Sequence, residues 1–135
     1  MLRRMRRDDT GAAVVDFVMM SVLLLMLLFG VLQVAVYFYA RNVVAASAAD
    51  AARYAAAESV DVAAGATRAD HLVHEGLDEA DASSIHCHAA LGRDGTSGLP
   101  ITTVRCTGHV RLLFSPLAMP LTIDVRSSVL KEGRR

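Results

Sequence analysis

The distribution of hydrophobic and polar residues divides the chain into a membrane-length segment and a smaller mixed region. Residues 17–40 carry no charged side chain, and as a helix they would extend about 36 Å at ~1.5 Å per residue. This length is sufficient to cross a hydrocarbon layer of ~30 Å. Alanine is abundant over residues 41–63, and neither Pro nor Gly occurs there. One helix is therefore expected over 12–63, with a stop near Gly65.

Small apolar residues recur at helical spacing in the part of this helix beyond the apolar run. They are Val44, Ala48, Ala51 and Ala55. Small side chains let another element approach closely. The stripe is expected to pack either on a neighbouring helix or on the chain's own small domain, and both can apply along different parts of its length.

The remaining residues, 64–135, are expected to form one small domain. Apolar residues at 3/4 spacing predict a short second helix from about Arg68 to Asp81, begun by a capping box of Thr67 and Asp70. Asp78, Glu79 and Asp81 are expected to form a solvated face. Beyond this helix the hydrophobic period changes to two, which predicts β-strands.

The alternating runs predict a small antiparallel sheet of about three strands. The runs lie near residues 85–91, 102–112 and 121–129, with Pro116 and Pro120 before the third. Turn-forming residues 92–98 are expected to join the first two strands as a hairpin. The predicted fold class is α+β, with a long N-terminal transmembrane-plus-extension helix, a short second helix and this sheet.

The two cysteines test the predicted hairpin. Placing Cys87 opposite Cys106 puts Ala89 opposite Val104 and Leu91 opposite Thr102, so the buried sides of both strands coincide. A disulfide would close a loop of about 20 residues and stabilise the domain by roughly 3 kcal/mol in the chain-entropy model. An oxidising location outside the cytoplasm permits this bond. The alternative is a pair of free, buried thiols.

Charge sets the expected orientation. The leader, residues 1–11, carries Arg3, Arg4, Arg6 and Arg7 against two acids, Asp8 and Asp9, while the whole chain is formally neutral. This excess of arginine predicts a cytoplasmic N-terminus and an extracytoplasmic domain. A dense basic face for nucleic acid is lacking in the sequence, and 135 residues leave room for one small domain beyond the membrane segment.

Asp16 lies at the threshold of the apolar run, where an acid is costly and is usually retained for a specific pairing. Gly11 precedes it by five residues, and Phe17 follows it. A basic leader, a glycine, this acid and an aromatic residue before an apolar helix resemble the processing region of type IVb prepilins. Within those, the chain is most similar to the TadE-like family of tight-adherence (Flp-type) pilus assembly proteins. Residues 37–41 and 50–56 extend the resemblance.

The resemblance implies that a prepilin peptidase cleaves after Gly11 and leaves Ala12 as the new N-terminus. The family usually has Glu where this chain has Asp16. The new α-ammonium would lie four residues before Asp16, on the same helix face. In a stack of parallel helices, the acid of one subunit could meet the ammonium of its neighbour and fix their register. The alternative is that Asp16 is an interfacial acid favoured by the helix dipole.

Two function classes follow from these residues. The first is a structural minor pilin or pseudopilin, with a prepilin peptidase, other pilins and the pilus assembly machinery as implied partners. The second is an uncleaved, membrane-anchored accessory protein whose domain binds another envelope protein. A conventional signal peptide fits less well, because its apolar region is about 7–15 residues long.

The histidines raise a weaker, third hypothesis of a zinc-dependent enzyme. His71 and His74 are three residues apart, and three further histidines, His86, His88 and His109, lie near the cysteines in the sequence. A zinc site needs about four converging ligands, whereas His86 and His88 would point away from Cys87 on a strand. The sequence therefore predicts no metal, no cofactor, no small-molecule substrate and no catalytic residues.

Overall fold

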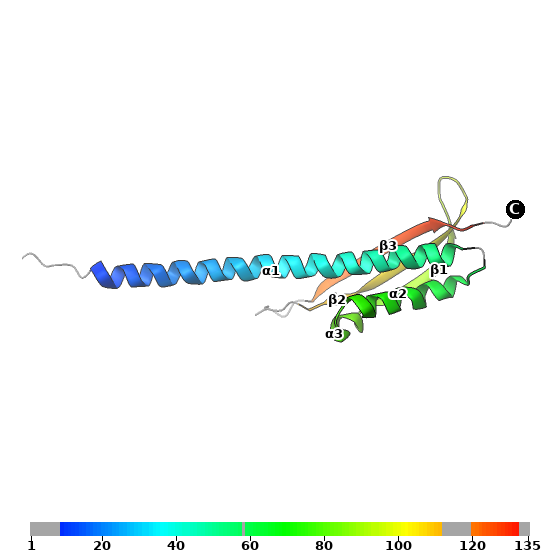
Figure 1. Cartoon of the computed structure of the whole chain (residues 1–135). Coiled ribbons are helices and arrows are strands. Elements are labelled where there is room, and N and C mark those ends of the chain that lie inside the picture. Colours follow the sequence, from blue (N-terminus) through cyan, green and yellow to red (C-terminus); the bar gives the residue numbers. More distant parts are fainter. Residues whose placement is uncertain (1–8, 58, 112–119, 133–135) are drawn as a thin grey trace, which may run out of the picture.

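One long helix, α1, runs from Asp9 to Ala56 and spans 48 residues. The computed structural model describes residues 9–57, 59–111 and 120–132. The N-terminal half of α1 projects away from the rest of the protein, whereas its C-terminal half packs against the other elements (Figure 1). The first fully buried residue of α1 is Ala40, which is 2% exposed. The predicted apolar run and the packed extension are thus two halves of one continuous helix.

Helix α1 ends earlier than predicted. It stops at Ala56 rather than near Ala63, and Gly65 lies inside the next helix, α2 (Val62–Gly76). The carboxylate of Asp61 accepts a hydrogen bond from the backbone N–H of Ala63 at 3.2 Å and caps α2. A Cβ atom at Gly65 would lie 2.7 Å from the Cβ of Ala55. Gly65 therefore permits the close approach of α2 to α1 and does not end a helix.

The second helix also begins earlier than the predicted residues 68–81. Helix α2 is followed by one separate turn of helix, α3 (Glu79–Ala82). The proposed capping box is wrong, because Thr67 and Asp70 lie well inside α2. Instead, the Asp70 carboxylate accepts a hydrogen bond from the backbone N–H of Cys87 at 3.2 Å. This contact joins α2 to the first strand of the sheet.

The sheet contains three antiparallel strands in the order β1-β2-β3: β1 (His86–Arg93), β2 (Pro100–Val110) and β3 (Leu121–Leu130). The predicted register is confirmed, since Cys87 pairs with Cys106, Ala89 with Val104, and Leu91 with Thr102. Residues 94–99 close the β1–β2 hairpin, with Gly98 at a φ of 67°. The predicted second strand extended to Leu112, but Leu112 and Pro116 lie outside the described residues.

The core fills the space between one face of the sheet and helices α1 and α2. The small stripe of Val44, Ala48, Ala51 and Ala55 is fully buried in it. The stripe therefore packs on the chain's own domain, which is one of the two expected outcomes. Larger side chains complete this core from the other elements: Val73, Ile85, Val104, Val110 and Ile123.

The C-terminal end of β3 is tied to the C-terminal end of α1. The Nζ atom of Lys131 donates to the carbonyl oxygens of Ala55 and Ala57 at 2.8 Å, and to that of Val60 at 3.1 Å. These are carbonyls at and just beyond the end of α1, where backbone acceptors lack helical partners. A cation at this end of the helix also complements the helix dipole. Lys131 thus helps to fix where α1 ends.

Candidate functional site

The predicted processing and assembly residues lie on the projecting half of α1. Gly11, Ala12, Asp16 and Phe17 are all helical and all exposed, Phe17 by 72%. A Cβ atom at Gly11 would have no heavy atom within 4 Å outside its own helix and chain neighbours. In the described part of the chain, Asp16 makes no ion pair. The arginines of the leader and Asp8 lie outside the described residues.

The helical geometry brings Ala12 and Asp16 together. Both lie in α1, and residues four apart on an α-helix share one face. An α-ammonium on Ala12 would therefore lie on the side of the helix that carries the Asp16 carboxylate. Among the described residues, no strand or other helix packs against α1 near Asp16 (Figure 1), so this face is accessible to a neighbouring helix. The geometry is suited to an ion pair within one chain or between two chains.

The projecting half of α1 has the character of a membrane anchor. In the described residues, α1 is the one helix long and apolar enough to cross a bilayer, with a mean hydropathy of 2.6 in its most apolar window. None of that window is buried inside the protein. A soluble protein would bury so apolar a helix in its core. The arrangement indicates membrane anchoring through this segment.

The predicted disulfide is present between Cys87 and Cys106. The S–S distance is 2.04 Å, and the two Cα atoms are 4.0 Å apart. Both cysteines are buried beneath the helices, at 5% and 0% exposed. The bond therefore crosslinks β1 and β2 inside the core of the domain.

The histidines do not converge on a common point. His71 faces Glu75 at 3.6 Å and His74 faces Glu79 at 3.5 Å, both on the surface. His86 and His88 are exposed on strand β1, whereas Cys87 between them is buried, as the alternation predicted. Within residues 9–57, 59–111 and 120–132, no group of three His, Cys, Asp or Glu side chains is placed to hold a metal ion.

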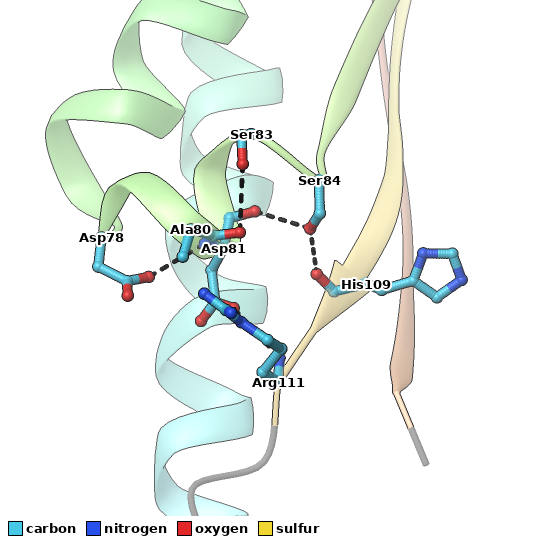
Figure 2. A network of polar contacts seen from close by, with 7 residues as sticks. All are labelled: Asp78, Ala80, Asp81, Ser83, Ser84, His109 and Arg111. Atoms are coloured by element: carbon cyan, nitrogen blue, oxygen red, sulfur yellow. Dashed lines mark hydrogen bonds and ion pairs between the residues drawn. The ribbon is translucent and has the colours of Figure 1, made fainter. Parts of the chain in front are cut away.

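The acids near α3 are exposed at Asp78 and Glu79, as predicted, whereas the prediction of a solvated face is wrong for Asp81 (Figure 2). Asp81 is only 17% exposed, and its carboxylate accepts a hydrogen bond from the backbone N–H of Arg111 at 3.1 Å. Asp78 caps α3 by accepting from the N–H of Asp81 at 3.1 Å. The Ser84 hydroxyl lies against the carbonyl oxygens of both Asp81 and His109. These contacts fix α3 against the end of β2.

An ion pair lies on the face of the sheet opposite the helices. The Nε atom of Arg105 donates to the Asp124 carboxylate at 2.9 Å. This hydrogen bond and the positive charge of Arg105 lower the pKa of Asp124 below its ordinary value. Sequence reasoning missed the pair because Arg105 and Asp124 are on different strands. The strand register, which pairs Arg105 with Arg126 and Thr107 with Asp124, was the signal that could have found it.

Together, these features define an α+β protein in which a long apolar helix, suited to membrane anchoring, leads into a small disulfide-bonded domain. Residues 11–53 match the family model for TadE-like proteins, which confirms the family resemblance expected from the sequence. The match begins at Gly11 and covers both the projecting half of α1 and most of its packed half. No curated protein and no solved structure matches the chain.

Proposed function

We propose that this protein is a minor pilin or pseudopilin of the TadE type, a structural component in the assembly of a tight-adherence pilus or a related secretion system. The observation that carries the proposal is the family match that begins at Gly11 and runs along α1. The bare helical segment around Asp16 supports it, because an assembly surface has to be accessible to another subunit. The role is structural rather than catalytic.

In this proposal, α1 inserts with its N-terminus in the cytoplasm and its disulfide-bonded domain outside the membrane. A prepilin peptidase then cleaves after Gly11 and creates an α-ammonium on Ala12. The Asp16 carboxylate of one subunit pairs with the ammonium of a neighbouring pilin, in the membrane or in a filament. A different axial register would leave a charge unpaired in a low-dielectric environment, so the pair selects one register.

Cleavage controls the whole sequence of events. The charge that Asp16 pairs with does not exist until the leader is removed, so the uncleaved chain inserts but does not assemble. Asp is one methylene shorter than the Glu usual in the family. The Asp16 carboxylate therefore requires the neighbouring ammonium to approach more closely.

The substitution Asp16→Asn tests this mechanism, because it removes the charge at nearly constant volume. We expect normal membrane insertion and at least a tenfold loss of incorporation into pili or pilin complexes, measured by co-purification with the other pilins. A matched control is Asp9→Asn, which alters an acid in the leader and should leave incorporation unchanged. Equal incorporation of wild type and Asp16→Asn would contradict the proposed pairing. Retention of the leader in assembled protein would favour the uncleaved, membrane-anchored accessory protein instead.

A further inference from the structure

A groove lies where the globular domain meets α1, near the end of the apolar run. Val36, Tyr39 and Ala40 of α1 form one side of it, and Leu77, Asp78 and Arg111 are among the residues on the other. The Tyr39 hydroxyl donates to the carbonyl oxygen of Gly76 at 3.1 Å and joins the two sides. This groove is separate from the Gly11–Phe17 segment.

The position of the groove along α1 sets its depth relative to a membrane. The uncharged run ends at Ala40, and Ala40 is also the first residue of α1 that the domain buries. No spacer therefore separates the domain from the apolar segment. Tyr37 and Tyr39 lie at the same level, and tyrosine is enriched where helices leave the hydrocarbon layer. If residues 17–40 cross the bilayer, the groove opens at the level of the lipid headgroups.

The charges in the groove are of both signs and are held in place. Arg111 is 68% exposed, and its Nε atom lies 3.7 Å from the carboxylate of Asp81. The backbone N–H of Arg111 donates to the same carboxylate (Figure 2). Only the Nε atom of the guanidinium faces Asp81, so the donors on its two terminal nitrogens are available for a ligand. Asp78 uses one carboxylate oxygen to cap α3 and is exposed. A cationic donor and a carboxylate thus border an apolar wall formed by Val36 and Leu77.

We propose that this groove binds the headgroup of an aminophospholipid from the surrounding membrane. The lipid phosphate would accept hydrogen bonds from Arg111, and its primary ammonium would donate to Asp78. The acyl chains would follow the apolar surface of α1 beside Val36. An acidic lipid without an amine fits less well, because Asp78 and Asp81 repel it. A trimethylated amine fits less well too, because it has no N–H to donate.

The inference rests on the membrane insertion that is part of the proposed function. Bound lipid would hold the domain against the membrane surface, and this contact must break when a subunit leaves the bilayer. The groove therefore supplies an anchoring contact in addition to the apolar helix.

Lipid retention by the full-length protein tests the site. The protein is reconstituted with phosphatidylethanolamine, phosphatidylglycerol or phosphatidylcholine, and retained lipids are counted by native mass spectrometry. We expect roughly tenfold stronger retention of phosphatidylethanolamine than of the other two, in line with the loss of one charge-assisted hydrogen bond. Arg111→Gln should weaken this retention about tenfold. Asp78→Asn keeps a good helix cap and should remove the preference for the primary amine over the trimethylated one.

Arg126→Gln is the matched control, because Arg126 is an exposed arginine on β3 that does not line the groove. Equal retention of the three lipids by wild type would overturn the lipid site, as would equal losses in Arg111→Gln and Arg126→Gln. Each variant is first shown to be folded by its intact disulfide and its thermal unfolding. A chain that remains in the soluble fraction would overturn the membrane proposal itself, whereas an inserted chain without lipid preference would overturn only the site.

Discussion

At the scale of single residues, Gly65 shows how closely the two helices of the domain are packed. A Cβ atom there would lie 2.7 Å from the Cβ of Ala55 and 3.3 Å from the carbonyl oxygen of Ala51. Neither neighbour can move by rotating a flexible side chain. The absence of a side chain at residue 65 is therefore a packing requirement between α1 and α2.

The substitution Gly65→Ala should destabilise the protein despite the better helix propensity of alanine. We expect a loss of about 1–3 kcal/mol in the free energy of unfolding from overpacking. Thermal unfolding of the full-length protein in detergent measures it. Gly95→Ala is the control, because a Cβ atom at Gly95 has nothing within 4 Å. An unchanged or raised melting temperature for Gly65→Ala would show that α1 and α2 are less closely packed than described.

The Arg105–Asp124 pair gives a pH-dependent prediction. The hydrogen bond from Arg105 lowers the pKa of Asp124 below the ordinary value of 3.8. A lowered pKa in the folded state stabilises the protein above the unfolded pKa, and this stabilisation is lost as the pH falls through the folded value. The pair should thus weaken only under strongly acidic conditions.

An NMR titration of the Asp124 carboxyl carbon measures this effect directly. We expect a midpoint below 3.8 in the wild type and a return toward 3.8 in Arg105→Gln. Asp94 is an internal control, because the pKa of Asp94 is lowered mainly by hydrogen bonds from Ser97. Its midpoint should be the same in both proteins. If the Asp124 midpoint were the same in wild type and Arg105→Gln, the ion pair would be excluded in solution.

At the scale of elements, the end of α1 depends on contacts distant in sequence. Lys131 follows β3 and donates to three carbonyls at or just beyond the end of α1. A half-buried ammonium that satisfies three acceptors contributes more than a surface ion pair. This contact holds the last strand across the C-terminal end of the helix.

The substitution Lys131→Met should therefore destabilise the C-terminal end of α1 and the end of β3. We expect a loss of about 1–3 kcal/mol in stability, because carbonyls near the helix end lose a charged donor. Hydrogen exchange should show faster exchange of the amides at the end of α1 and in the last residues of β3. Lys131→Arg keeps a cation and should lose less. Unchanged exchange in both segments of Lys131→Met would show that the lysine is dispensable.

Much of the fold could be predicted from local patterns. The errors lie at helix ends, where contacts between residues distant in sequence determine the bounds. The strand register followed from one consistent pairing of Cys87 with Cys106, because alternation fixes which face each residue occupies. The break after Ala56 carries no Gly or Pro. It is set by Asp61, Gly65 and Lys131, which act through α2 and β3.

The candidate sites also differ in whether they can be predicted from local sequence. Gly11 and Asp16 could be proposed from the sequence because their signal is a local spacing along one helix, and their roles stay predictions. The Asp81–Arg111 contact joins residues 30 positions apart, and no local period relates them. The groove beside Tyr39 could therefore be found only once the domain and α1 were seen together.

At the scale of the whole molecule, the two halves of α1 have different partners. The C-terminal half supplies a stripe of small residues to the core of its own domain, whereas the N-terminal half projects away from that domain (Figure 1). In our account, the N-terminal half of α1 first contacts membrane lipid and then contacts neighbouring pilins. In this account, only the second step needs a new N-terminus.

The most direct test of this account is the N-terminus of the protein isolated from membranes of cells that contain the prepilin peptidase. Intact mass and N-terminal sequencing should show a mature chain that begins at Ala12, and cells without the peptidase should give a chain that keeps the leader. A chain that still carries Arg3–Arg7 in the presence of an active peptidase would contradict the account.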